Sequence, residues 1–317
     1  MQITLSAVYL DRFSRALGDL GVGEHERIML AVSGGPDSLA LLLMAQQVAT
    51  DQIVAATVDH KLRPEAEDEA AYVSDLCQKI GVPHVTLVPS QQIKGNIQSA
   101  ARAVRYARLE EAADEHACTF TATAHHGDDQ LETMLMRLAR GSGIDGLAAI
   151  RPRYGRVIRP VLGFSKSELE KICIDAGVEP VRDPSNENPE FDRVNMRRWL
   201  AQSPHPFDIA RANRTARALS DAAEALAWTV SGLAEQHITE EHQQIQCDAE
   251  QFPRDLKRRL LLICLSRIEP DLKPRGDAID RLLADLDAGK TATIGNILCQ
   301  GGKVWRFSAA PPRRPAR

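Results

Sequence analysis

The sequence lacks any closely spaced pair of cysteines. Zinc ribbons and thiol–disulfide motifs need two cysteines separated by about two residues, and no such pair occurs. This absence excludes both kinds of site and indicates isolated, reduced thiols, which are typical of cytoplasmic proteins. The six cysteines are scattered along the 317 residues, at Cys77, Cys118, Cys173, Cys247, Cys264 and Cys299.

Long hydrophobic runs are also missing. The apolar run near residue 40 extends only from Leu39 to Ala45, whereas a membrane-spanning helix needs about 20 apolar residues. At the N-terminus, Asp11 and Asp19 fall where the apolar part of a secretory signal would continue. We therefore expect no signal peptide, no membrane association and a cytoplasmic location.

The chain has no strong excess of one charge, but the two signs are unevenly distributed. Its net charge is −4, which by itself argues weakly against a nucleic-acid partner. Residues 193–317, however, contain 20 basic and 15 acidic residues, and six arginines lie within 193–217 with one acidic residue. This asymmetry fits either a solvated helix surface or an RNA-contacting second half, and the charges alone leave both open.

The first half of the sequence does contain a clear alternation of strand and helix patterns. Helical patterns cover 65–80 and 96–116, and another follows the capping sequence SKSE at 165–168. Between them lie short continuous apolar runs, which are typical of strands buried on both faces of a parallel sheet. The alternation predicts an α/β fold with a doubly wound, five-stranded parallel sheet. The predicted strands are 28–32, 53–58, 85–88, 120–124 and 157–162.

After residue 181 this alternation stops. Long helical patterns follow at 209–236 and 254–268, and a short hairpin is predicted at Gly301 and Gly302. A chain of 317 residues is expected to form about two domains. We predict a catalytic domain over 1–204, a mainly helical domain with a small terminal hairpin over 205–310, and a tail over 311–317.

A short polar segment separates the first predicted strand from the helix after it. Backbone N–H groups at a helix start form an anion site together with the helix dipole, and glycines let a ligand approach the backbone closely. The segment lacks the lysine of the GxxxxGK[ST] loop, which disfavours transfer of a terminal phosphoryl group. We predict a phosphate-binding loop; the alternative is a tight turn whose glycines serve only steric needs. The segment is Ser33, Gly34, Gly35, Pro36, Asp37 and Ser38.

Three acidic residues follow the predicted strand at 120–124. Asp128, Asp129 and Glu132 are spaced so that their carboxylates share one face at a helix start. Such a group suits an ammonium ligand, and the alternative is stabilisation of the helix dipole. The adjacent His125 and His126 have no third histidine at ligand spacing, so a structural or nucleotide-contacting role is favoured over a metal site.

Several segments, in order, resemble the motifs of a known enzyme family. The loop at 33–38 is similar to the pyrophosphate-binding loop of N-type ATP pyrophosphatases. Residues 58–66, 101–109, 124–147 and 182–186 are similar to further motifs of the tRNA(Ile)-lysidine synthetases, notably HHGDDQLET and RGSGIDGL. The resemblance covers about residues 27–200. The chain departs from the family pattern at Lys61, Ala66 and Asn195.

The resemblance implies a ligase that joins L-lysine to C2 of the wobble cytidine of a tRNA-Ile with a CAU anticodon. Cytosine O2 attacks the α-phosphorus of ATP and pyrophosphate leaves; the lysine amine then displaces AMP. The product, lysidine, changes codon reading from AUG to AUA. The resemblance further implies a sheet of the adenine-nucleotide alpha-hydrolase type with strand order 3-2-1-4-5, Mg²⁺, and a second domain that contacts tRNA. It leaves monomer and homodimer open.

The resemblance also implies roles for individual residues. Asp37 is expected to hold Mg²⁺. The substrate lysine is expected at Asp129, Glu132 and Asn186. The catalytic residues implied are Asp37, Arg105, Asp129, Glu132 and Arg197. The residues expected to bind ATP are Ser33, Gly34, Gly35, Pro36, Asp37, Ser38 and His60.

Two other kinds of function remain open. A different ATP pyrophosphatase is disfavoured, because 2-thiocytidine synthetases usually need paired cysteines and amidotransferase-coupled synthetases need a glutaminase domain or partner. A nucleotide-sensing module without catalytic activity is disfavoured by the carboxylate face at 128–132 and by the basic second half.

Overall fold

Two compact units make up the chain, and each is described by itself. The computed structural model describes residues 3–59, 65–88, 97–181, 192–202 and 205–311. The first unit covers Met1–Ser220 and the second covers Asp221–Arg317. All six cysteines are buried and free, as their spacing predicted. Within the described ranges, no helix is both long enough and apolar enough to span a bilayer.

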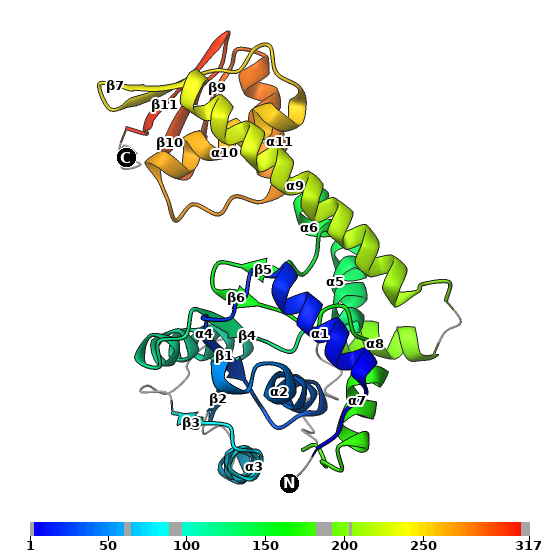
Figure 1. The fold of residues 1–317 in the computed structure, drawn as a ribbon. Helices are drawn as coiled ribbons and strands as arrows, with labels where there is room; N and C mark the ends of the chain where they lie inside the picture. Colours follow the sequence, from blue (N-terminus) through cyan, green and yellow to red (C-terminus); the bar gives the residue numbers. More distant parts are fainter. Residues whose placement is uncertain (1–2, 60–64, 89–96, 182–191, 203–204, 312–317) are drawn as a thin grey trace. The chain divides into compact units, whose positions relative to one another are not determined.

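A six-stranded sheet forms the centre of the first unit (Figure 1). Its order is β3-β2-β1-β4-β6-β5; the pairs from β3 to β6 are parallel, and β5 adds an antiparallel edge. The predicted five-stranded parallel sheet and its order 3-2-1-4-5 are therefore confirmed. The two residues of β5 are too few to leave an apolar run in the sequence. The strands are β1 Ile28–Ala31, β2 Ile53–Val58, β3 His84–Leu87, β4 Phe120–Ala122, β5 Arg153–Tyr154 and β6 Val157–Ile158.

Helices cover both faces of this sheet, as successive residues of β1 show. Ile28 and Leu30 pack into a core with α1, α2, α3 and α7, whereas Met29 packs with α4 on the opposite face. This alternation follows from the period of two residues in a strand, and it confirms the doubly wound arrangement. The helices are α1 Ala7–Asp19, α2 Pro36–Val48, α3 Glu65–Ile80, α4 Ile97–Glu115, α5 Gly127–Ala139, α6 Ile144–Leu147, α7 Lys166–Asp175 and α8 Asp192–Gln202, with a 3-10 turn, η1, at Thr50–Gln52.

The predicted capping sequence at residue 165 starts α7. The Glu168 N–H donates to Ser165 Oγ over 3.2 Å, and the Ser165 N–H donates to Glu168 Oε2 over 2.8 Å. These reciprocal bonds satisfy two N–H groups that a helix start otherwise leaves unpaired. The start of α7 matters for the site below, because a side chain from α5 also binds there.

The second unit combines helices with an antiparallel sheet. The hairpin predicted at Gly301 and Gly302 joins β10 to β11, but it belongs to a five-stranded sheet of order β7-β8-β11-β10-β9. The sequence indicated only this hairpin and not the rest of the sheet: β7 and β9 are short and largely solvent-facing, so they lack a strand-like apolar run. The elements are α10 Arg254–Ile268, α11 Gly276–Asp287, β7 Ile238–Glu241, β8 Gln244–Asp248, β9 Thr291–Ile294, β10 Ile297–Gln300 and β11 Val304–Ala309.

The long helix α9, Ile209–His237, runs across the division between the units. The sequence predicted a boundary at residues 204–205, whereas the compact units divide after Ser220. The first turns of α9 pack on the catalytic unit: Asn213 Nδ2 donates to the carbonyl of Leu162 over 3.2 Å. The helical pattern of a sequence does not show which domain each turn of the helix packs against. The sequence therefore could not predict this contact.

Candidate active site

The loops after β1 and β4 meet at the point where the strand order reverses. The chain continues from β1 to β2 on one side, while β4 lies on the other side of β1. Open α/β sheets bind ligands at such a switch point, beyond the carboxyl ends of the strands. Here the two loops are joined by an ion pair, with His126 Nε2 3.6 Å from Asp37 Oδ2.

The loop after β1 is shaped for close approach of an anion. Gly34 has φ +84°, which favours glycine, and a Cβ there would lie 3.3 Å from Val181 and 3.4 Å from Val73. Gly35 precedes α2 and Pro36 starts it, and no side chain caps this helix. The first N–H groups of α2 are therefore not taken up by a cap and are available to a phosphate.

Two serines fix the loop from within. Ser38 is buried, accepts a hydrogen bond from the Ser33 N–H over 3.1 Å and donates to the Gly35 carbonyl over 3.0 Å. The Ser33 hydroxyl lies 3.2 Å from that of Ser38 and is exposed. Ser38 is thus a structural member of the loop, whereas Ser33 can offer its hydroxyl to a ligand.

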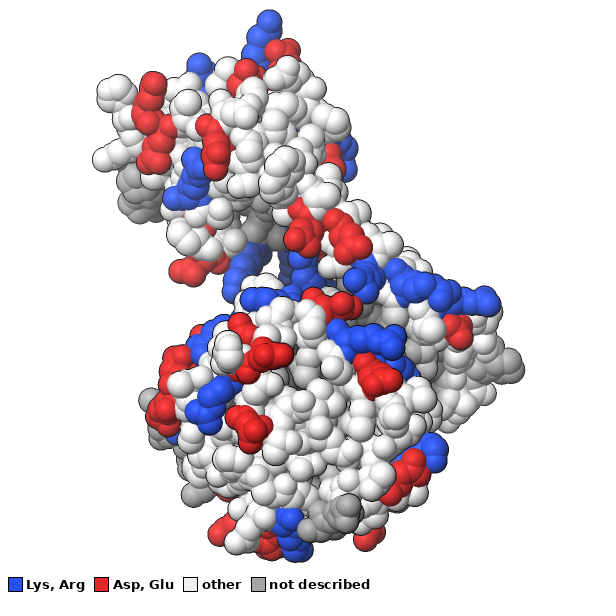
Figure 2. Space-filling model, viewed as in Figure 1, with Lys and Arg blue, Asp and Glu red and all other residues white. Residues whose placement is uncertain are grey.

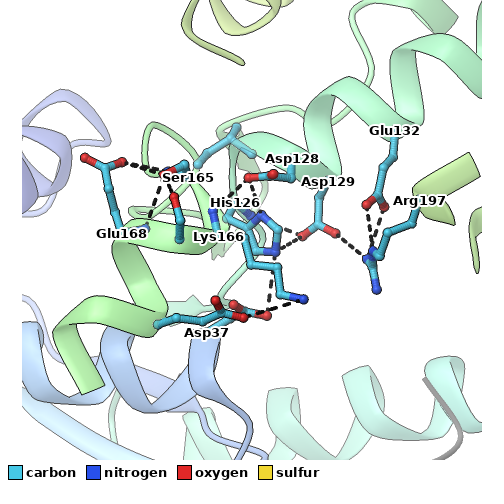
Figure 3. Close-up of polar contacts among 12 residues, drawn as sticks. Asp37, His126, Asp128, Asp129, Glu132, Ser165, Lys166, Glu168 and Arg197 are labelled. Atoms are coloured by element: carbon cyan, nitrogen blue, oxygen red, sulfur yellow. Dashed lines mark hydrogen bonds and ion pairs between the residues drawn. The ribbon is translucent and has the colours of Figure 1, made fainter. Parts of the chain in front are cut away.

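His126 lies at the centre of an acidic group (Figure 3). Its ring nitrogens lie 3.6 Å from Asp37, 3.5 Å from Asp128 and 3.7 Å from Asp129. Burial disfavours the imidazolium charge, but contacts with Asp128 and Asp37 and the charge of Asp129 outweigh it and raise the pKa of His126 to about 10. At neutral pH this histidine is therefore a cation that holds three carboxylates together.

We predict that this charge makes stability depend on alkaline pH. The pKa of His126 is about 10 in the folded protein and about 6.5 when unfolded, so its contribution is complete below about pH 6.5 and is lost as the pH rises toward 10. Denaturant unfolding between pH 6 and 10 should show this loss, and a His126→Gln variant should be less stable at neutral pH and lack that component. Equal pH profiles for the two proteins would contradict the assignment.

Asp37 belongs to the first turn of α2 and faces this group. Its Oδ1 is buried and has no hydrogen-bond partner among the described residues. A buried acceptor of this kind is costly unless something binds it. The free oxygen is therefore a candidate ligand for a cation or for a donor of the substrate.

Asp128 is directed away from the other two acids of its helix. Its Oδ2 accepts the backbone N–H of Lys166, at the start of α7, over 2.7 Å. Burial raises the pKa of the Asp128 carboxyl, but the contact with His126 and this N–H together hold it below its usual range. Asp128 thus anchors α5 to α7, and the face predicted to carry three carboxylates offers two, Asp129 and Glu132.

Glu132 is buried and both of its oxygens bind arginines of α8. Arg197 Nε donates over 2.8 Å to Oε1 (Figure 3), and Arg193 Nε donates over 3.1 Å to Oε2. Asp129 Oδ1 lies 3.8 Å from Arg197 and 3.9 Å from Arg193. The two carboxylates and two guanidinium groups form one network beside the Asp37–His126 pair.

Arg105 lies in a second group with Arg102 and Tyr106 on α4, and its guanidinium carbon is 5.7 Å from the centroid of the Tyr106 ring. Burial lowers the pKa of Arg105; Tyr106 opposes this effect and Arg102 adds to it. Arg102 Nη2 donates to the Tyr106 hydroxyl over 3.2 Å, and within the described part of the chain neither arginine pairs with a carboxylate. Burial, opposed by Asp129 but reinforced by nearby arginines, lowers the pKa of His125 to about 3. This group therefore favours an anion.

Two predicted site residues, His60 and Asn186, lie outside the described residues, so their roles stay predictions.

Two residues that the sequence did not assign to the site belong to it in the structure. His126 was considered only for structural or nucleotide contacts, and Arg193 was treated as part of a basic stretch. The spacing of Arg193 and Arg197, one helical turn apart, was the available signal.

Comparison with known proteins assigns this arrangement to a family. A PP-loop domain model matches residues 7–203. The chain is 42% identical over 301 residues to the tRNA(Ile)-lysidine synthase of Zymomonas mobilis, covering 92% of this chain and 90% of that protein. The chain belongs to the tRNA(Ile)-lysidine synthase family. The corresponding protein of Novosphingobium aromaticivorans is 40% identical over 306 residues, covering 92% of this chain and 91% of that protein.

Among solved structures, the fold of this family member is similar to that of the U34-tRNA thiolase NcsA from Methanococcus maripaludis. The two chains superpose with a TM-score of 0.53 at 16% identity, over 67% of this chain and 79% of that one. At this identity the likeness supports the fold alone. It agrees with the PP-loop domain match and with the parallel sheet described above.

Proposed function

We propose that this protein catalyses the ATP-dependent ligation of L-lysine to C2 of the wobble cytidine of tRNA-Ile with a CAU anticodon, giving lysidine, AMP and pyrophosphate. The observation that carries the proposal is the 3.6 Å pair between His126 and Asp37. It joins the anion-binding loop at 33–38 to the helix that carries Asp129 and Glu132. One crevice thereby offers a phosphate site and carboxylates for an ammonium group, in the cytoplasm where we expect the enzyme to act.

In the first step, cytosine O2 attacks the α-phosphorus of ATP and pyrophosphate leaves. The uncapped N–H groups at the start of α2 and the exposed hydroxyl of Ser33 are placed to donate to the pyrophosphate oxygens. Arg105, which pairs with no carboxylate among the described residues, is suited to the charge that develops on a phosphate or on the activated cytidine. These donors are fixed before the reaction, because Ser38 holds the loop from within.

The residues present also fit a magnesium ion. Mg²⁺ prefers oxygen ligands and is commonly bound by one or two carboxylates together with substrate phosphates, and Asp37 Oδ1 is a buried carboxylate oxygen without a partner among the described residues. Within these residues no group of three or more His, Cys, Asp or Glu side chains is arranged to hold a metal alone. We therefore expect Asp37 to hold the ion jointly with ATP, where it would neutralise charge on the leaving pyrophosphate.

In the second step, the lysine amine attacks C2 and AMP leaves. We place the lysine ammonium at Asp129 and Glu132, with Asn186 as a further contact. Glu132 binds Arg193 and Arg197 in the absence of substrate, so an arriving ammonium has to share this carboxylate with them or displace one. The two arginines meanwhile hold the Glu132 carboxylate in position, and Asp129, at 3.8–3.9 Å from them, is less firmly held.

Pyrophosphate release with and without each substrate tests the proposal. With ATP and tRNA-Ile, release should depend on the tRNA and should amount to about one equivalent per enzyme when lysine is omitted. Added lysine should permit turnover and the appearance of AMP. Release that ignores tRNA would point to a different ATP pyrophosphatase, and binding of ATP without any release would point to a nucleotide-sensing module.

We further propose that exposed arginines of α9 contact the tRNA backbone. Arg211, Arg214 and Arg217 are exposed, and Figure 2 shows basic side chains gathered over the N-terminal half of this helix. Replacing all three by glutamine should weaken tRNA binding and reduce the slope of log K against log salt by about 2, because about 0.7–0.9 counterions are released per phosphate contact. The exposed Arg15→Gln is the control. An unchanged slope in the triple variant would place the RNA surface elsewhere.

A further inference from the structure

A groove of about 340 Å³ lies between α5 and α8. Its lining includes Met136 and Ala139 from α5, Arg140 directly after that helix, and Asp192, Met196 and Trp199 from α8. Met136 follows Glu132 by one helical turn, and Met196 directly precedes Arg197, so the groove adjoins the carboxylate–arginine network. Its volume is at the lower end for small-molecule sites, which suits one planar group rather than a larger ligand.

Trp199 in the groove and its neighbour Phe207 outside it both expose aromatic surface. Trp199 is 48% exposed and Phe207 is 40% exposed. Their ring centroids are 6.5 Å apart, and the His205 ring is 5.6 Å from that of Phe207. Aromatic residues make up only 4% of the sequence, so few exposed aromatic neighbours are expected by chance. Trp199, Phe207 and His205 nevertheless lie together. The half-exposed Trp199 and the two methionines beside it, Met136 and Met196, form a stacking surface for a flat, polarisable ring.

The surroundings of the groove favour a polyanion. Arg140 forms the rim together with its ion-pair partner Asp192, and Arg137 is exposed on the next turn of α5. The exposed arginines at 211, 214 and 217 lie in the same unit of the chain. Proteins that bind single-stranded nucleic acid combine these two features, aromatic faces for the bases and basic side chains for the backbone.

We propose that this groove binds one unpaired nucleobase of the substrate tRNA, next to the wobble cytidine in the anticodon loop, stacked on the face of Trp199. The inference rests on the proposed function and names the part of the substrate that this surface holds. RNA loops are recognised by splaying bases onto aromatic side chains. Holding a neighbouring base beside the carboxylate–arginine network would fix the position of the wobble base relative to the loop at 33–38.

The test combines enzyme variants with abasic tRNA. Trp199→Ala should weaken binding of a tRNA-Ile transcript by about 5- to 150-fold, the range that stacking of one base corresponds to, whereas Trp199→Phe should retain most of the affinity. Leu138→Ala is the matched control, because Leu138 is 62% exposed on α5, the other helix beside the groove, but does not line the groove. Removing the base of one nucleotide flanking the wobble cytidine should weaken tRNA binding to the wild-type enzyme by a similar factor. The same removal should cause little further loss of affinity in Trp199→Ala.

Several results would overturn this inference. Wild-type affinity of Trp199→Ala for tRNA would do so, and would leave the groove to another occupant such as a protein segment. The inference would also be overturned if removing the flanking base did not weaken tRNA binding to the wild-type enzyme, or if it weakened binding equally in the wild type and in Trp199→Ala. If the alanine variant fails to fold, the measurements with abasic tRNA and the wild-type enzyme still decide. If the wild-type enzyme forms lysidine on intact tRNA in these experiments, the proposed function stands whatever the stacking result.

Discussion

Replacing Asp37 by alanine is expected to abolish adenylation of the tRNA. Asp37, within the anion-binding loop, contributes a buried oxygen without a partner among the described residues and one of the carboxylates that surround His126. Loss of a single group that stabilises developing charge typically reduces the rate by 100- to 1,000-fold, and loss of a metal ligand adds to that. Pyrophosphate release in the presence of ATP and tRNA should therefore fall by at least about 100-fold.

The competing role for Asp37 is a simple interaction with the dipole of α2. That role is worth about 0.3–1 kcal/mol, so it would appear in the free energy of unfolding and leave catalysis nearly intact. Asp37→Asn separates the two, since it keeps the shape and removes the charge. Near-normal pyrophosphate release in Asp37→Asn, with only a small change in stability, would make Asp37 a structural acid.

Glu132→Gln is expected to cripple the second step of the reaction and to spare the first. A lysine ε-amine has a pKa of about 10.4, so lysine arrives as an ammonium ion. Carboxylates at 129 and 132 favour that form, which binds well but cannot attack until its proton is lost. Removing one negative charge should raise the lysine concentration required by about 10- to 150-fold, the range of one charge-assisted hydrogen bond.

The adenylated tRNA should then accumulate in Glu132→Gln. The anion-binding loop is separate from Glu132, so pyrophosphate release in a single turnover should stay close to that of the wild type. Glu115→Gln, an exposed acid on α4, is the control for a generic loss of charge. A block of pyrophosphate release with a normal lysine requirement would show that Glu132 serves ATP, either directly or by holding Arg193 and Arg197 in place.

The sequence predicted the catalytic sheet well, because its strands are buried on both faces. Ile53–Val58 is apolar except for Thr57, as a position buried on both faces favours, and was predicted to the residue. β6, by contrast, contains only two residues of the predicted strand at 157–162. Pro160 lacks a backbone N–H and cannot continue the hydrogen bonding between strands. The second sheet was largely missed, because strands such as Thr291–Ile294 are partly exposed and carry no continuous apolar run.

The chemistry of the site could be predicted only in part. Helical spacing predicted that Asp128, Asp129 and Glu132 share one face, but it could not show that Asp128 instead binds the start of α7. The role of His126 depends on Asp37, 89 positions earlier in the chain, and the role of Arg193 depends on Glu132. Pairings between distant segments leave no local pattern, so they needed the folded structure.

The most direct test of the central claim is the mass of the wobble nucleoside after reaction. A tRNA-Ile transcript with a CAU anticodon is incubated with the enzyme, ATP, Mg²⁺ and L-lysine, digested to nucleosides and analysed by mass spectrometry. The account predicts that one cytidine gains the mass of lysine less one water, only when ATP and lysine are both present, and that the adenylated form appears when lysine is omitted. An unmodified wobble cytidine under complete conditions, with folded and ATP-binding enzyme, would contradict it.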